Sequence, residues 1–327
     1  MKKTVAWLGG EYFSSELEKF NYDVRKIIFY SPKVYTWEMI CSEIGCEPDV
    51  VVYADASIPP PIAGVESFPC PTVFYCIDSH IHSWYPLYAQ GFDMCAVSLK
   101  DHICHFEKKR LKEKDLLWLP PYPIRNEHPP KESPAKELDV IFVGNVNDTT
   151  PFRRDFLNEF SKGLESFAVK KGSFAQLFPT AHIVLNIAER GDLNFRVFEA
   201  LACGACLLTP KIENGQETLF TDGFHFFTYE LNNSEDALRV ASFLLENKEV
   251  CRKVGENGNR IINSKHRPTN RAMLLVNHIE SFEKKRIHDR LANQKQIKSN
   301  YTRLIYLHWA AILTNDAIKE RYLQAAL

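Results

Sequence analysis

Two charged residues three positions apart, Arg196 and Glu199, have the types and spacing that suggest nucleotide chemistry. The residues before Gly204 have helical periodicity, so both charges lie on one helix face, about 4.5 Å apart along the axis. An arginine at a helix N-terminus suits a diphosphate, and a carboxylate one turn later suits the hydroxyls of a ribose. The alternative is a solvent-exposed ion pair without a ligand.

The segment around this pair carries a family resemblance. Residues 194–210 contain the pattern R-x-F-E-A-x-A-C-G-A-x-L-L-T, and Gly215, Glu217 and 220–223 follow it. This stretch resembles the C-terminal half of GT-B glycosyltransferases, most closely the CgeB-like group of spore-maturation proteins, and the likeness covers residues 138–280. The resemblance implies an α/β fold of two Rossmann-like doubly wound domains, with a nucleotide-sugar donor in the second domain.

Length and composition agree with a globular protein of two domains. The chain has 327 residues, 45% of them hydrophobic, and a formal net charge of -1, so we expect no general attraction to nucleic acid. Nine scattered cysteines indicate free thiols in a reducing compartment. We find no signal-peptide core and no apolar run that could span a membrane, and therefore expect a soluble cytoplasmic protein.

Residues 1–123 alternate apolar runs with helical patterns, which predicts an N-terminal Rossmann-like domain on the acceptor side. The expected strands cover residues 5–8, 26–29, 50–53, 72–77, 94–97 and 116–119. The expected helices cover residues 15–20, 36–44, 84–90 and 102–111. The prolines of residues 124–138 then indicate an interdomain linker.

A second α/β cycle is expected over residues 139–280, as the nucleotide-sugar-binding domain, and a C-terminal helical extension over 281–327. The expected strands of this domain cover residues 139–143, 167–169, 182–187, 206–208 and 225–228. The extension has apolar residues at helical spacing, among them Leu304, Leu307 and Ile312. We therefore expect it to pack on the body of the protein, and in GT-B folds a C-terminal helix usually returns to the first domain.

The resemblance also implies roles for residues of the second domain. Arg196 and the amides of its helix would stabilise the leaving diphosphate, and Glu199 would hold the ribose. Arg153 would contact the donor phosphates, and Asn186 would reach the base or cap a loop. The full set of donor-binding candidates is Gly144, Asn145, Arg153, Asn186, Asn194, Arg196, Glu199 and Glu217.

Polar residues of the first domain follow its fourth strand, at the end where open α/β sheets bind ligands. Asp78 or His80 could act as the base that takes the acceptor proton if the configuration inverts. We assign His82 and the pair Gly9 and Gly10 to the acceptor side, with a capped loop and a tight turn as the alternatives. Zinc binding by the Asp78 to His82 cluster is a further alternative, but no additional ligand is obvious.

Two features limit these assignments. The retaining GT-B families have a second carboxylate eight residues before Glu199, where this chain has Gly191, so retention or inversion stays open. Cys203 and Cys206 form a C-x-x-C, but it closes a helix, whereas the thioredoxin-type motif opens one. A redox function of this C-x-x-C is therefore not expected.

The sequence thus predicts a metal-independent glycosyltransferase, of the hexosyltransferase type, with a nucleotide diphosphate sugar as donor and no cofactor. The acceptor is a glycan, a protein or a small molecule that the sequence does not identify, and the oligomeric state is equally open. The alternatives are a sugar-nucleotide epimerase or phosphorylase of the same fold, and a non-catalytic protein that binds nucleotide sugars.

Overall fold

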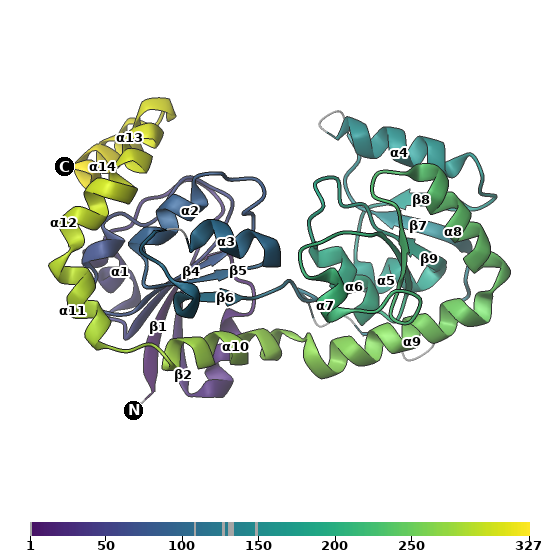
Figure 1. Cartoon of the computed structure of the whole chain (residues 1–327), viewed down its shortest axis with the longest axis horizontal. Coiled ribbons are helices and arrows are strands. Elements are labelled where there is room, and N and C mark those ends of the chain that lie inside the picture. Colours follow the sequence, from purple (N-terminus) through teal and green to yellow (C-terminus); the bar gives the residue numbers. More distant parts are fainter. Residues whose placement is uncertain (1, 108, 126–127, 130–133, 148–149) are drawn as a thin grey trace. The chain divides into compact units, whose positions relative to one another are not determined.

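The computed structural model describes residues 2–107, 109–125, 128–129, 134–147 and 150–327. Its contacts divide the chain into two compact units, which are considered separately. The first unit joins Met1–Pro120 to Arg271–Leu327, and the second contains Pro121–Asn270. Residues from both ends of the chain therefore build the first unit (Figure 1).

A six-stranded parallel sheet forms the centre of the first unit, in the order β2-β1-β3-β4-β5-β6. The strands are β1 (Lys3–Gly9), β2 (Tyr22–Ile28), β3 (Val50–Ala54), β4 (Thr72–Cys76), β5 (Met94–Val97) and β6 (Leu116–Trp118). Every residue of β3, β4 and β5 is buried, which explains why these strands are continuous apolar runs in the sequence. All six predicted strands are present, although β2 begins at Tyr22, before the predicted residue 26.

Short helices connect these strands. They are η1 (Ser14–Phe20), α1 (Trp37–Ile44), η2 (Val65–Ser67), α2 (Tyr85–Tyr88), η3 (Ala89–Gly91), η4 (Lys100–His102), α3 (Ile103–Phe106) and η5 (Glu113–Asp115). The helix predicted over 102–111 is wrong in its second half, because α3 ends at Phe106. The side-chain oxygen of Gln90 accepts hydrogen bonds from the backbone amides of Arg110 and Leu111, at 2.8 and 3.0 Å, which holds these residues in a non-helical segment.

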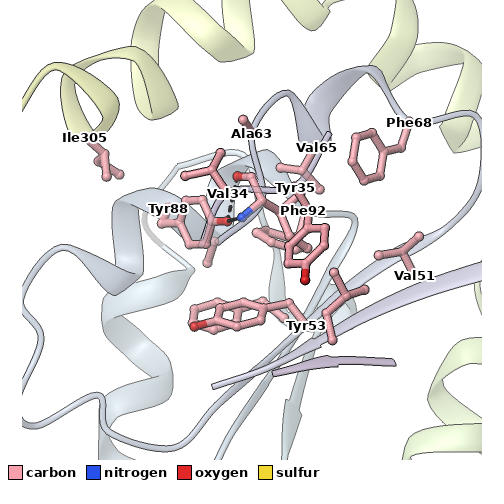
Figure 2. Close-up of a cluster of buried hydrophobic side chains, with 14 of the residues drawn as sticks. Val34, Tyr35, Val51, Tyr53, Ala63, Val65, Phe68, Tyr88, Phe92 and Ile305 are labelled. Carbon is pink, nitrogen blue, oxygen red and sulfur yellow. Dashed lines mark hydrogen bonds between the residues drawn. The ribbon is translucent and has the colours of Figure 1, made fainter. Parts of the chain in front are cut away.

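An aromatic core covers one face of this sheet (Figure 2). Tyr53 stacks on Phe74 with ring centroids 5.1 Å apart, and Tyr88 meets both rings edge-on. The hydroxyl of Tyr88 donates to the carbonyl of Ile62 at 2.9 Å and accepts from its amide at 3.2 Å. This buried hydroxyl is therefore satisfied, and the core combines a large apolar area with fixed geometry.

The C-terminal region consists of helices that belong to the first unit. They are α10 (Pro268–Glu280), α11 (Lys285–Ala292), α12 (Gln294–Ile297), the π-helical turn η7 (Lys298–Thr302), α13 (Arg303–Ile312) and α14 (Asp316–Ala326). Their packing on the aromatic core is confirmed, but the predicted face of α13 is wrong. Ile305 and Tyr306 are buried, whereas Leu304 and Ile312 are 62% and 53% exposed. The apolar side chains of α13 lie on several sides of the helix, so their spacing alone could not identify the buried side.

Arg290 of α11 fixes these helices to the first sheet. Its guanidinium is fully buried and pairs with Asp93 at 2.8 Å. The remaining N–H groups donate to backbone carbonyls, namely those of Val65, Glu66, Phe68 and Cys70. Replacing Arg290 would remove all of these contacts together. Removing one partner of a buried ion pair typically lowers the free energy of unfolding by about 3 to 5 kcal/mol.

The second unit is built on a five-stranded parallel sheet in the order β11-β10-β9-β7-β8. The strands are β7 (Leu138–Val143), β8 (Phe167–Lys170), β9 (Ala181–Leu185), β10 (Cys206–Pro210) and β11 (Phe227–Tyr229). The helices are α4 (Pro151–Ser161), α5 (Phe174–Leu177), η6 (Phe178–Thr180), α6 (Phe195–Ala202), α7 (Gln216–Leu219), α8 (Ser234–Glu246) and α9 (Lys248–Lys265). Two parallel-sheet α/β units with a helical C-terminal region confirm the predicted fold class.

A helix that crosses a bilayer must be long and largely apolar. Within the described part of the chain, no helix is long and apolar enough to cross a membrane.

Candidate nucleotide-sugar site

Arg196 occupies the first turn of α6, and its guanidinium connects three elements of the second unit. Nε donates to the carbonyl oxygen of Val143, the last residue of β7, at 2.9 Å. Nη1 donates to Oδ1 of Asn186, directly after β9, at 3.1 Å. The guanidinium also lies over the ring of Phe142, 4.8 Å from its centroid. The positive charge is thus held at the carboxyl ends of β7 and β9, where parallel sheets bind ligands.

Arg196 is a buried cation that lies near a second arginine and two carboxylates. Burial and, to a smaller extent, the charge of Arg153 lower the pKa of Arg196 to about 10, and the carboxylate of Glu199 opposes this shift. The guanidinium therefore stays charged at neutral pH. Glu199 is only 5% exposed, which excludes the solvent-exposed ion pair considered from the sequence. A charged arginine beside a helix N-terminus is a suitable site for an anion.

Asn186 is completely buried and orients this arginine. Its Oδ1 accepts from Arg196, and its Nδ2 donates to the hydroxyl of Thr209 in β10 at 3.0 Å. Its carbonyl accepts a hydrogen bond from the Tyr229 hydroxyl at 2.8 Å. With these groups engaged, the geometry supports a positioning role for Asn186 more directly than a contact with a nucleotide base.

Gly144 follows β7 and leaves space for the guanidinium. A Cβ atom at this position would lie 2.8 Å from Nη2 of Arg196, closer than real Cβ contacts allow. The amide of Gly144 donates to the carbonyl of Lys170 at 3.0 Å, so it continues the pairing of the sheet. The glycine predicted to contact the donor is therefore needed first for the placement of Arg196.

Arg153 of α4 lies close to this cluster. Its Nη1 donates to the carbonyl of Asn145 at 2.9 Å, and its Nε forms an ion pair with Glu189 at 2.7 Å. The Arg153 side chain thereby connects the loop after β7 with the loop after β9. The structure brings together six residues that the sequence assigned to one site, through hydrogen bonds, close approach and charge interactions with Arg196: Gly144, Asn145, Arg153, Asn186, Arg196 and Glu199.

The remaining donor-side candidates lie at the edge of this cluster or outside it. Asn194 is the N-cap residue of α6, and its Nδ2 donates to the carbonyl of Ile187 at 3.3 Å. Glu217 is an exposed residue of α7, 3.8 Å from the ammonium of Lys211. Gly191 has φ +69°, a backbone conformation that strains other residues and favours glycine at this position.

Asp55, which the sequence analysis missed, organises the loops at the carboxyl edge of the first sheet. This buried residue follows β3 directly. Its carboxylate accepts hydrogen bonds from the amides of Ser57, Ile77 and Asp78, at 2.8, 3.1 and 2.9 Å, and from the hydroxyl of Tyr85. Burial raises the pKa of Asp55, and these hydrogen bonds oppose the increase. The rule that selected Asp78, a polar residue just after a strand, would also have found Asp55.

The predicted acceptor-side cluster lies in the loop that Asp55 holds. The carbonyl of Asp78 accepts from the amide of His82 at 3.1 Å, so the loop forms a turn. Nε2 of His82 lies 2.7 Å from the hydroxyl of Ser57. Burial, followed by the charges of His105 and His80, lowers the pKa of His102. The loop therefore has a defined conformation, set by Asp55.

Close contacts within the protein explain why both position 9 and position 10 are glycine. Gly9 has φ +97°, and a Cβ atom there would lie 2.0 Å from the carbonyl oxygen of Ala54. A Cβ atom at Gly10 would fall 2.2 Å from the ring of Tyr12. These contacts account for both glycines as parts of a tight turn, and an acceptor role remains a prediction.

A metal centre was the alternative for the histidine cluster. Across the residues with described positions, no three His, Cys, Asp or Glu side chains are arranged to hold one ion. The structure therefore gives no support to zinc binding by Asp78, His80 and His82.

Comparisons with known proteins identify the class of this architecture. Residues 133–277 match a family model described as glycosyl transferase-like. Among solved structures, Anabaena HepE in complex with UDP and glucose aligns with a TM-score of 0.60 and 10% identity, over 86% of this chain and 100% of that chain. Sucrose-phosphate synthase from Thermosynechococcus elongatus aligns with a TM-score of 0.59 and 10% identity, over 84% and 98%.

A glycosyltransferase from Rickettsia africae aligns with a TM-score of 0.54 and 10% identity, over 91% of this chain and 99% of that chain. At this identity the structural likeness shows the fold, which is that of GT-B glycosyltransferases. A search of curated proteins finds no match. The family match covers residues 133–277, less than half of the chain, and the likeness over both units is one of fold. The region that carries the family match contains the whole Arg196 cluster.

We predict that Asp55→Asn destabilises the first unit by about 2 to 4 kcal/mol, because an amide nitrogen replaces one acceptor oxygen and buried amides lose their partner. Tyr85→Phe is the matched control, since it removes only one hydrogen bond and should cost about 1 kcal/mol. Urea unfolding, followed by tryptophan fluorescence, measures both. Equal effects of the two substitutions would contradict the central role of the carboxylate.

Proposed function

We propose that the protein transfers a sugar from a UDP-sugar to an acceptor hydroxyl, with the donor bound by the second unit. The observation that carries this proposal is the buried, charged guanidinium of Arg196 at the carboxyl ends of β7 and β9, beside the N-terminus of α6. UDP is proposed as the nucleotide because HepE was solved with UDP and with UDP-glucose. The R-x-F-E-A pattern beginning at Arg196 supports a place in the CgeB-like group.

In this proposal, Arg196 and Glu199 bind different parts of the donor. The guanidinium and the first amides of α6 would stabilise the negative charge that grows on the leaving diphosphate. Glu199, one turn later on the same helix, would accept hydrogen bonds from the ribose hydroxyls. Arg153 would add a second positive charge to the phosphate side.

We further propose that the reaction needs neither a metal ion nor a cofactor. Arg196, Arg153 and the helix amides would supply the positive charge that a divalent cation supplies in other sugar transferases. The acidic D-x-D-type motif that such a cation uses is not seen in the sequence.

The first unit is proposed to bind the acceptor and to supply the general base. Asp78 and His80 are the candidates, because the hydrogen bonds of Asp55 fix their loop at the carboxyl edge of the first sheet. A base of this kind is required if the configuration inverts, since the acceptor proton must leave as the new bond forms. The nine cysteines, all present as free thiols, support the cytoplasm as its location.

We predict that Glu199→Gln weakens UDP binding by about 1 to 2 kcal/mol, or about 5- to 30-fold in Kd, because a charge-assisted hydrogen bond becomes a neutral one. A thermal-shift panel of UDP, GDP, ADP, CMP and dTDP first identifies the best nucleotide, and calorimetry then measures its affinity. Glu235→Gln, an exposed position of α8, is the matched control and should bind like the parent protein. Unchanged affinity in Glu199→Gln would refute the ribose assignment.

We predict that transfer, or hydrolysis of the UDP-sugar when no acceptor is supplied, continues in excess EDTA, because side chains and helix amides provide the positive charge. Release of UDP measures the rate before and after chelation. Loss of turnover that Mn²⁺ or Mg²⁺ restores would overturn the metal-independent mechanism.

We predict that removing the general base lowers turnover about 100- to 10,000-fold while leaving donor affinity unchanged. Asp78→Asn and His80→Ala are measured separately, with UDP binding checked by calorimetry in each variant. A kcat effect in one of them identifies the base. Parental turnover in both variants would show that the base lies elsewhere or that the reaction retains configuration. Donor binding without any transfer, across many acceptors, would instead favour a non-catalytic binding protein.

A further inference from the structure

A cavity of about 610 Å³ opens at the amino ends of β9 and β10 in the second unit. This is the opposite edge of the sheet from Arg196, which lies at the carboxyl ends. Cys203, Cys206 and Cys251 line the cavity. The glycosyltransferase function leaves these cysteines without a role, although the sequence had drawn attention to the first two.

Two of these thiols are in direct contact. Cys206 is the first residue of β10, and Cys251 lies in the first turn of α9. Both residues are free cysteines, 3% and 5% exposed, and their thiol groups form a hydrogen bond with each other. The contact joins two elements far apart in the sequence, whereas Cys203 and Cys206 of the C-x-x-C, for which no redox function was expected, are neighbours in the sequence alone.

Close packing of α9 fixes this contact. A Cβ atom at Gly255 would lie 2.3 Å from the carbonyl oxygen of Gly204, so the helix backbone rests directly on the turn before β10. Asn259, one turn further along α9, donates from Nδ2 to the carbonyl of Ala202 at 2.7 Å. The packing of α9 therefore fixes Cys251 beside the start of β10, where Cys206 lies.

The two thiols differ in their surroundings. The hydrogen bond from Cys206 lowers the pKa of Cys251, with further lowering by Lys136 and Lys248. The position of Cys251 in the first turn of α9 also favours a negative charge. The same hydrogen bond and burial raise the pKa of Cys206. The Cys251 thiol, which donates to the carbonyl of Leu244 at 3.2 Å, is thus the one of the two that ionises more readily and can act as the nucleophile.

The lining of the cavity favours an anionic reagent. Its basic side chains are Lys136, His182, Lys248, Arg252 and Arg260, whereas Glu256 is the acidic residue among those that line it. Arg252 is already paired with Glu249 and Glu256, which leaves Lys248 as the next cation of the lining in sequence distance from Cys251. Such a lining attracts small anions to the thiolate.

We propose that Cys206 and Cys251 form a reversible disulfide by exchange with an anionic low-molecular-weight disulfide that enters this cavity. The Cys251 thiolate attacks one sulfur of the reagent, forms a mixed disulfide and releases the other half as a thiolate. Cys206 then loses its proton to that thiolate and attacks Sγ of Cys251, which releases the second half. Two protein thiols are oxidised, one reagent disulfide is reduced, and two reagent thiols leave.

The test uses oxidised glutathione as the anionic disulfide and the full-length protein. We expect loss of two of the nine thiols and full recovery with dithiothreitol. Tryptic mapping without reduction should show residues 197–211 linked to residues 249–252. The first peptide contains both Cys203 and Cys206, so Cys203→Ala must keep the linkage, whereas Cys206→Ala and Cys251→Ala must lose it. Lack of this peptide pair in the folded parent protein would overturn the proposal, independently of how the variants fold.

A second comparison tests the role of the basic lining. The parent protein should react about tenfold faster with oxidised glutathione than with neutral hydroxyethyl disulfide, and Lys248→Gln should reduce this preference. Linkage of Cys203 to either partner, or glutathione found only on the exposed Cys46 and Cys104, would refute the assignment. Equal rates with both reagents would refute the anionic specificity.

Discussion

The second unit is organised around one buried positive charge. The guanidinium of Arg196 must keep hydrogen-bond partners, because an unpaired charge in this position would be costly. Val143 and Asn186 supply these partners from the ends of two neighbouring strands, and Gly144 leaves room for the planar group. The same contacts that stabilise the arginine therefore also aim it at the edge of the sheet. The proposed binding site for an anionic donor depends on the way in which this charge is satisfied.

The first unit also has a buried ionisable group at the edge of its sheet, but this group is acidic. Asp55 is buried, and its carboxylate is satisfied by backbone amides from two loops and by Tyr85. In both units a buried ionisable group at the carboxyl edge of a parallel sheet fixes the loops that follow the strands. Each of these loops therefore has one defined conformation, which a preorganised site requires. The candidate base at Asp78 or His80 depends on this arrangement.

The sequence predicted the elements better than the contacts between them. Apolar runs identified the strands, because the central strands of each sheet are buried on both faces. Helical spacing pointed to Arg196 and Glu199, and a strand end pointed to Asp78. Asp55 was missed because a single acidic residue after a strand looks like an ordinary loop residue until its partners are known. The buried face of α13 was assigned wrongly, since apolar residues lie on several sides of that helix. Periodicity reports which residues are apolar, and only tertiary packing decides which of them are covered.

The cysteines also show that spacing in the sequence does not identify which residues are in contact. Cys203 and Cys206 are close in sequence, yet Cys206 contacts Cys251, because Gly255 allows α9 to approach the start of β10. The other end of β10 carries Thr209, which binds Asn186 and so supports Arg196. One strand therefore connects the thiol pair with the donor site. Pairing with β9 and β11 holds this strand on both sides, so a bond at its first residue would constrain a strand already in place. On this argument, the thiol pair stabilises the second unit without changing the geometry around Arg196.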